Sequence, residues 1–146
     1  MTLPYSRATS GDKAIAEVQK MLKTFGCDKF GVMQDYAAGT MIVQFEWKGH
    51  QVTFPASING YAAMWLKENP WNRNRKSTRE EWQARALEIG GFAVCSILRD
   101  WIKAQVMAVE TGLVTFEEVF LAHIHTGSGQ RFIEFAKSHT LIEDKA

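Results

Sequence analysis

The sequence predicts an α+β domain: an N-terminal helix, a three-stranded antiparallel meander, a helix, a long central helix and two short C-terminal helices. Three patterns favour this class: apolar residues at helical spacing near the N-terminus, alternating apolar and polar residues between 41 and 54, and a long helical pattern from about 79 to 110. The 146-residue chain has no internal repeat or linker. We therefore expect residues 1–146 to form one domain with the helices on one face of the sheet.

The first element is an amphipathic helix over residues 11–25. Its apolar face repeats at spacings of three and four and comprises Ala14, Ile15, Val18, Met21, Leu22 and Phe25. Ser10 or Asp12 is expected to cap the free N–H groups at its start, and Gly26 to end it.

The sheet is predicted from residues 29–54. Residues 41–54 alternate in the manner of a hairpin around a Lys48-Gly49 turn, and a shorter strand is expected over residues 29–34. Pro55 is expected to close the sheet, because proline has no N–H to donate to a strand ladder.

Four further segments follow the sheet. A helix over residues 59–67 is stopped by Pro70, and a Thr115 to Glu118 capping box begins a short helix. A last helix carries Phe132, Ile133 and Phe135. The tail over residues 143–146 is expected to fray.

The long helix is predicted to begin at a capping box, Thr78 to Glu81, and to run to about Glu110. Its middle is apolar nearly all round, which indicates that it passes through the core. Gly90 and Gly91 interrupt this pattern. They permit either the close approach of another element or a kink.

Composition excludes several classes of protein. No apolar run approaches the roughly 20 residues of a membrane-spanning helix, and the polar N-terminus does not resemble a secretory signal, so we expect a cytoplasmic protein that does not enter membranes. Cys27 and Cys95 are far apart, which argues for packing roles and against a disulfide framework or zinc site. The net charge of +1 excludes a strongly basic coat protein but permits a local basic patch.

The loop over residues 69–77 is the most informative stretch for function. The candidate nucleic-acid-binding residues in and beside it are Lys67, Trp71, Arg73, Arg75, Lys76 and Arg79. Cations next to Asn, Ser and Thr donors suit phosphate contacts, and an exposed Trp71 could stack on an unpaired base. The alternative is a solvated loop whose Trp71 folds back next to Trp65 and Trp82.

Signals for catalysis or metal binding are weak. His123 and His125, with His139 further on, lack the geometry of a metal site, and no catalytic motif or cofactor motif is present. Asp100 is the one acid of interest, because burial on the long helix would raise its pKa. Its ordinary role would be an ion pair with Arg99 or a neighbouring cation. We expect a protein without catalytic residues, bound metal or cofactor.

A series of short segments along the chain is distinctive: Leu3-Pro4-Tyr5, Ala8-Thr9-Ser10-Gly11, Phe30-Gly31-Val32, Ala62-Ala63-Met64-Trp65-Leu66, Pro70-Trp71, Glu110-Thr111-Gly112, Phe116-Glu117 and Phe120-Leu121-Ala122. Together they resemble a family of small proteins of tailed bacteriophages and prophages. The resemblance spans nearly the whole chain and implies a context of early phage genes for DNA replication and recombination. It assigns no catalytic residue. The order of the first elements also resembles double-stranded RNA-binding domains and the core of single-strand annealing proteins.

Three hypotheses result. The leading one is a non-enzymatic phage accessory protein that binds DNA, either single-stranded or at ends, in the cytoplasm of the bacterial host. The second is an inhibitor or adaptor that binds a host nuclease or defence protein, anchored by some of its five Trp and nine Phe residues. The third is an enzyme with Asp100, Glu110 and the histidines as its only candidates. A homodimer is also expected, because the chain has only short helices to cover the apolar surface of the long helix.

Overall fold

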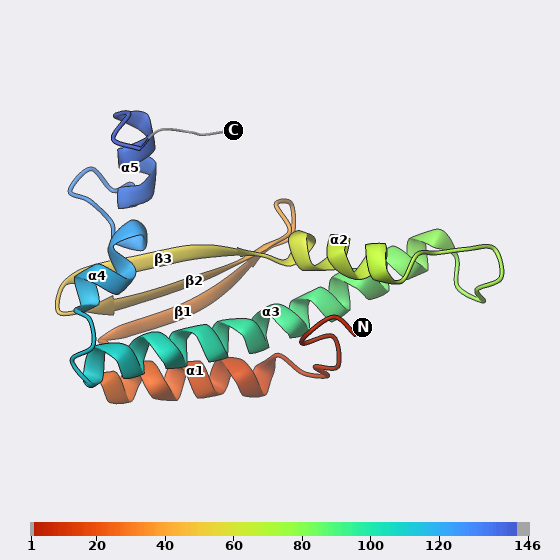
Figure 1. The fold of residues 1–146 in the computed structure, drawn as a ribbon, viewed down its shortest axis with the longest axis horizontal. Helices are drawn as coiled ribbons and strands as arrows, with labels where there is room; N and C mark the ends of the chain where they lie inside the picture. The colour runs from red at the N-terminus through yellow and green to blue at the C-terminus, as the bar shows by residue number, and fades with distance from the viewer. Residues whose placement is uncertain (1, 143–146) are drawn as a thin grey trace.

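The computed structural model describes residues 2–142 and confirms the predicted order of elements (Figure 1). In chain order they are α1 (Asp12–Phe25), β1 (Lys29–Asp35), β2 (Thr40–Trp47), β3 (His50–Ser57), α2 (Ile58–Glu68), α3 (Arg79–Glu110), α4 (Phe116–Phe120), the 3₁₀ helix η1 (Leu121–His123) and α5 (Phe132–Ser138). The tail over residues 143–146, for which fraying is predicted, lies outside the described residues.

The sheet is an antiparallel meander in the order β1-β2-β3. Lys48 and Gly49 both have positive φ angles, 46° and 81°, as the tight turn between β2 and β3 requires. The buried residues of one face are Met41, Val43, Phe45, Val52 and Phe54. The predicted period of two therefore sets which face of the sheet enters the core.

Two details of the sequence prediction are wrong. Pro55 lies inside β3, paired with Ile42, and does not close the sheet. An edge strand tolerates proline, because alternate N–H groups point away from the neighbouring strand. The N-cap of α1 is Gly11 and makes no side-chain capping bond, so neither Ser10 nor Asp12 caps this helix.

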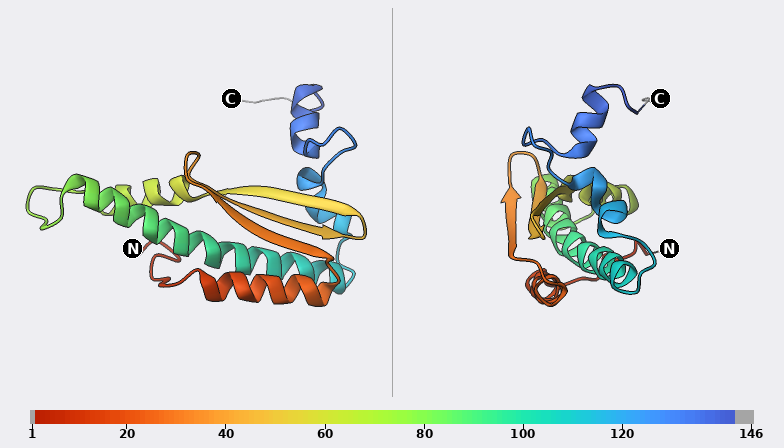
Figure 2. Two further views of the ribbon diagram at one scale, coloured as in Figure 1. Left: turned by 180° about the vertical axis from the view of Figure 1, so that it is seen from behind. Right: turned by 90° about the vertical axis from the view of Figure 1, so that its left-hand side faces the viewer.

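The inner face of the sheet is covered by α1, α3 and α4. α1 and α3 run side by side beneath the strands (Figure 1, Figure 2). Phe45 contacts Phe120 of α4 edge to face with ring centroids 5.4 Å apart, and Phe54 contacts Trp101 of α3 at 5.3 Å. These contacts join sheet and helices into one hydrophobic cluster.

α2 and the first part of α3 (residues 79–91) form a helical arm that extends beyond the sheet (Figure 1, Figure 2). The rings of Trp65 and Trp82 pack between the two helices with centroids 5.0 Å apart. A Cβ atom on Gly90 would lie 3.0 Å from the carbonyl oxygen of Ile58. Gly90 therefore permits the close approach of α2 to α3, which is one of the two predicted roles for the glycine pair.

The C-terminal part first extends the sheet and then leaves it. Ile124 forms a bridge with Val52, and the N–H of His125 donates to the carbonyl of Gln51 at 2.8 Å, so this segment lies along the free edge of β3. α5 then stands away from the rest of the molecule (Figure 1). Within residues 2–142, no helix combines the length and apolar character needed to cross a membrane.

Candidate nucleic-acid interface

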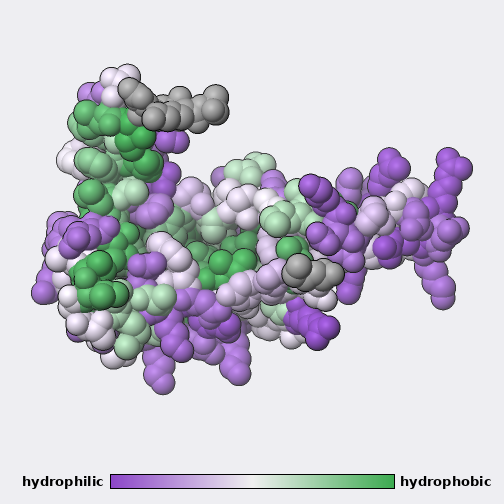
Figure 3. Space-filling model, in the orientation of Figure 1, coloured by the Kyte–Doolittle hydropathy of each residue, from purple (hydrophilic) through white to green (hydrophobic). Residues whose placement is uncertain are grey.

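The arm tip (residues 69–79) connects the two helices of the arm at its far end. It contains four cations and no acidic residue, and three glutamates flank it, Glu68 in α2 and Glu80 and Glu81 in α3. Figure 3 shows hydrophilic side chains gathered over this end of the molecule. The fold thus presents the predicted basic loop on a projection, where a large ligand can reach it from several sides.

The conformation of the arm tip is held by hydrogen bonds of its own. The indole N–H of Trp71 donates to the Ser77 carbonyl at 2.8 Å, and the indole N–H of Trp82 donates to the Asn69 carbonyl at 2.8 Å. The Asn72 side-chain oxygen accepts from the backbone N–H two residues later at 3.0 Å. Such local bonds provide partners for backbone groups of the turn, which would otherwise have to form hydrogen bonds with water.

Two of the arginines are anchored on this scaffold. The Arg75 guanidinium lies over the Trp82 ring, 4.1 Å from its centroid, and its Nε–H donates to the Pro70 carbonyl at 3.1 Å. The Arg79 guanidinium lies over the Trp71 ring at 5.0 Å. Cation–π contacts of this kind restrict the arginines without neutralising their charge.

The other cations of the predicted site are exposed. Arg73 and Lys76 lie on the loop, and Lys67 lies in the last turn of α2. Across the part of the chain that the structure describes, none of the five cations of the predicted site forms an ion pair with a carboxylate. The positive charge of the tip is therefore free to meet an anionic partner.

Trp71 is half-buried and is not the freely exposed ring that base stacking would favour. Its N–H is engaged by Ser77, and Arg79 covers one face of the ring. The Trp65 and Trp82 rings pack on each other. Trp71 therefore belongs first to the scaffold of the tip.

Asp100 differs from the expectation of a desolvated acid. Its side chain is 46% exposed, and it accepts hydrogen bonds from the Tyr5 hydroxyl at 2.7 Å and from Arg99 Nε at 3.0 Å. The bond from Tyr5, followed by that from Arg99, lowers the pKa of this carboxyl below its ordinary value. The expectation of a raised pKa is wrong, and the ordinary role in pairing with Arg99 is confirmed.

The histidines each have local partners. His123 packs edge to face against Phe54, with ring centroids 5.1 Å apart, and its Nδ1 lies 3.2 Å from Arg131 Nη1. The two ring nitrogens of His125 bond to Gly129 and Thr53. Within residues 2–142, no group of three or more His, Cys, Asp and Glu side chains is arranged to hold a metal ion.

Comparison of the chain with protein-family models, with curated proteins and with solved structures found no match. The candidate site therefore rests on its own residues and geometry.

The structure also contains a cavity of about 750 Å³ that the sequence analysis missed. It lies between the start of α1, the β1–β2 turn and the middle of α3. Its walls come from segments far apart in the chain, which no local pattern connects. The one available signal was Gly91, a helix-interior glycine on the cavity wall.

Proposed function

We propose that this protein is a non-enzymatic DNA-binding protein that grips the phosphate backbone of a single strand or a DNA end with its arm tip. The observation that carries the proposal is a projecting, ordered loop with four cations, no acid and no ion pair within the described chain. Phosphate contacts dominate affinity for nucleic acids and need this kind of uncompensated charge.

The geometry of the tip suits backbone contact in one further respect. Because Arg75 and Arg79 are held on indole rings, less side-chain freedom is lost on binding than for free arginines. We include in the proposal a role beside DNA replication or recombination in the cytoplasm of a bacterial host, which is the context that the sequence resemblance implies.

Fluorescence anisotropy with labelled single-stranded, duplex and overhang oligonucleotides tests this proposal. The test variant combines Lys67→Ala, Arg73→Ala and Lys76→Ala, which leaves the anchored arginines in place. We expect salt-dependent binding by the native protein. The salt slope of the variant should be smaller by about 2, because each cation that no longer meets a phosphate of a single strand lowers the slope by about 0.7.

The matched control combines Lys13→Ala, Lys20→Ala and Lys23→Ala, three exposed cations of α1. It removes the same charge from a surface remote from the tip, so its salt slope should stay close to that of the native protein. Equal losses in both triple variants would mean that overall charge, and not the arm tip, determines binding. An absence of binding at low salt would reject the proposal altogether.

A second candidate function is binding of a host protein, as an inhibitor or adaptor. The observation that favours it is apolar surface at the C-terminal end, where Leu121, Leu141 and Ile142 are 46%, 63% and 47% exposed. Figure 3 shows hydrophobic residues over α5 and the region below it. Exposed apolar patches of this kind mark protein interaction sites.

Capture of host proteins after nuclease treatment separates the two functions. A stoichiometric partner that is lost with Leu141→Asp, but kept with Met107→Asp on the exposed side of α3, would support the inhibitor or adaptor. A partner that disappears on nuclease treatment would support DNA binding instead.

A further inference from the structure

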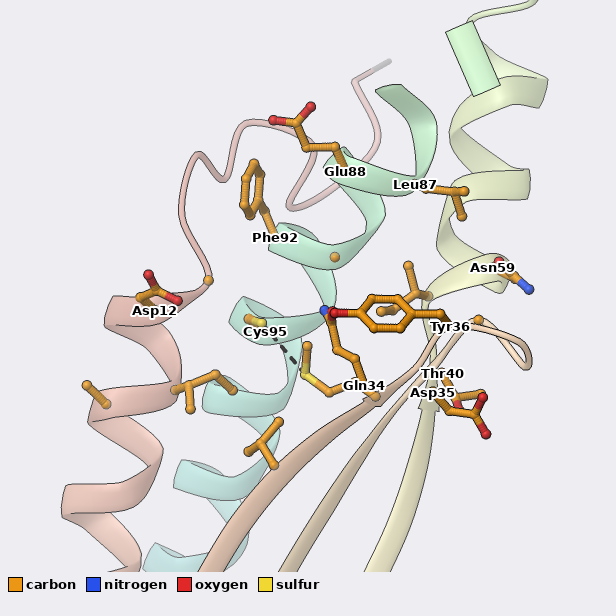
Figure 4. Close-up of a pocket in the computed structure, with 18 of the residues that line it drawn as sticks. Asp12, Gln34, Asp35, Tyr36, Thr40, Asn59, Leu87, Glu88, Phe92 and Cys95 are labelled. Atoms are coloured by element: carbon orange, nitrogen blue, oxygen red, sulfur yellow. Dashed lines mark hydrogen bonds between the residues drawn. The ribbon is translucent and has the colours of Figure 1, made fainter. Parts of the chain in front are cut away.

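The cavity behind the β1–β2 turn has an apolar floor. Met41, Ile58 and Cys95 form part of it and are buried, and Cys95 Sγ lies 3.8 Å from Met41 Sδ (Figure 4). Burial is the main cause that raises the pKa of the Cys95 thiol, and nearby Asp12 raises it further. The thiol is therefore neutral and acts as an apolar surface.

The rim of the cavity carries charge of a single sign. Its three charged residues are Asp12 at the start of α1, Asp35 at the end of β1 and Glu88 on α3, and no lysine, arginine or histidine lines the cavity. Among residues 2–142, no cation forms an ion pair with any of these carboxylates. The Asp35 carboxylate also accepts a hydrogen bond from the N–H of Ala38 at 3.0 Å within the β1–β2 turn. A positive group placed in the cavity would therefore meet a negative potential to which Asp12 and Glu88 contribute with no hydrogen bond from another side chain of the described residues.

Aromatic rings complete the mouth. Tyr36 is 87% exposed, and in Figure 4 its ring lies across the view of the cavity between the β1–β2 turn and α3. Phe92 lies on the α3 side and is half-buried. Ring faces attract organic cations, which adds a second kind of contact to that of the carboxylates.

Gly91 supplies an independent observation. A glycine inside a helix is less stable than alanine by about 1 kcal/mol, so its presence needs a reason. At Gly90 the reason is the close backbone of α2, but a Cβ at Gly91 would meet no atom within 4 Å. The absent side chain at Gly91 instead leaves the wall of the cavity open.

We propose that this cavity binds a small amphipathic organic cation, with its apolar part on the floor and its positive group at the acidic rim. The volume of about 750 Å³ falls within the range of small-molecule sites, which are mostly apolar with a few placed polar groups. An anion of the same shape is disfavoured, because all the charged residues that line the cavity are acidic. This site is separate from the arm tip and does not depend on DNA binding.

The test uses two probes with the same tail and opposite heads, hexyltrimethylammonium and hexanesulfonate, in isothermal titration calorimetry at low salt. We expect the cation to bind at one site and the sulfonate not to bind. The variant Gly91→Leu fills the open space and should weaken cation binding at least about tenfold, a difference of about 1.4 kcal/mol. Asp12→Asn with Glu88→Gln should weaken it and reduce its salt dependence.

Ala84→Leu is the control, since it adds the same side chain at an exposed position of α3 that does not line the cavity. Circular dichroism verifies that both leucine variants are folded. Equal binding of the two probes, no binding of the cation, or binding unchanged by Gly91→Leu would each overturn the proposal. Light scattering adds one more outcome: a dimer that becomes a monomer with Gly91→Leu would mean that a second copy of the chain occupies the cavity.

Discussion

The Tyr5 hydroxyl donates a hydrogen bond of 2.7 Å to the Asp100 carboxylate, 95 residues away on α3. A second bond, from the Tyr61 hydroxyl to the carbonyl of Pro4, ties the same segment to α2. The residues before α1 are thus fastened to α2 of the arm and to the part of α3 that follows the arm. This attachment joins the N-terminus of the described chain to the arm near its base.

Replacement of Tyr5 by phenylalanine should lower the free energy of unfolding at pH 7 by about 0.5–1 kcal/mol, the value of an exposed hydrogen bond after solvent screening. The pKa of Asp100 is depressed in the folded state, first by the Tyr5 bond and then by Arg99. The contribution of Asp100 to the free energy of unfolding is therefore present above the ordinary Asp pKa of about 4. It is lost as the pH falls through the pKa of Asp100 in the folded protein.

Urea unfolding at pH 7 and pH 3 checks this prediction. The difference between native protein and Tyr5→Phe should shrink at the lower pH. Tyr36→Phe is the control, because this exposed tyrosine has no hydrogen bond through its hydroxyl in the described structure. A difference that is the same at both pH values would argue against the bond to Asp100 as the cause.

His123 should make the protein less stable in mild acid. Burial is the main cause that lowers the pKa of His123, and the Arg131 charge lowers it further. Because the pKa of His123 is lower in the folded protein than in the unfolded chain, the stabilisation by neutral His123 is present above the ordinary His pKa of about 6.5. It is lost as the pH falls through the pKa of His123 in the folded protein. Thermal unfolding between pH 7.5 and 5 measures the effect.

The comparison variants for this prediction are His123→Asn and His139→Asn. The first should reduce the fall of Tm with decreasing pH, since the titrating group is gone. The second replaces an exposed histidine outside the hydrophobic cluster and serves as the substitution control. Parallel profiles for the native protein and His123→Asn would refute the assignment.

Arg75 and Arg73 should differ in their effect on stability although they are two residues apart. Arg75→Ala removes the contact with Trp82 and the bond to Pro70, which should cost about 1 kcal/mol in unfolding free energy. Arg73→Ala removes an exposed side chain and should change stability by less than about 0.5 kcal/mol. Denaturant unfolding of the two variants, with near-ultraviolet circular dichroism for the Trp82 environment, gives the comparison.

The two adjacent glycines of α3 should respond in opposite directions to alanine. Gly90→Ala forces a Cβ to within 3.0 Å of the Ile58 carbonyl oxygen and should destabilise the protein by about 1 kcal/mol or more. Gly91→Ala meets no atom within 4 Å and should stabilise it by about 0.5–1 kcal/mol through helix propensity. Differential scanning calorimetry of both variants decides the point, and a loss of stability with Gly91→Ala would show that this position is constrained.

Local patterns determined most of the element order. The period of two over residues 41–54 defines which face of the hairpin is apolar, and the Lys48-Gly49 turn is compatible with positive φ at both positions. Thr78 and Thr115 are the N-caps of α3 and α4, because a side-chain cap involves only residues of the same turn. The predicted capping box is complete at Thr115, whereas at Thr78 only the bond from the Glu81 N–H to the threonine side chain forms. The position of Pro55 was not predictable in this way, since proline is tolerated only where a strand lies at an edge.

The candidate site also combines features that local sequence predicts with features that it does not. The cluster of cations in residues 69–79 is visible in the sequence, as is its lack of acids. Other features depend on contacts made across turns or between distant segments. These are the anchoring of two arginines on indole rings, the half-buried position of Trp71 and the bond between Tyr5 and Asp100. A sequence pattern describes neighbours along the chain and carries no information on those distances.

The sequence by itself determined the α+β class, the bounds of the main helices and strands to within a few residues, and the place of the basic loop between two helices. Only the tertiary structure decided that the loop lies at the tip of an arm, and that acidic residues of α1, β1 and α3 line one cavity. The reason is physical: periodicity and capping act over one or two turns of chain, whereas charge convergence and cavities arise only when distant elements pack together.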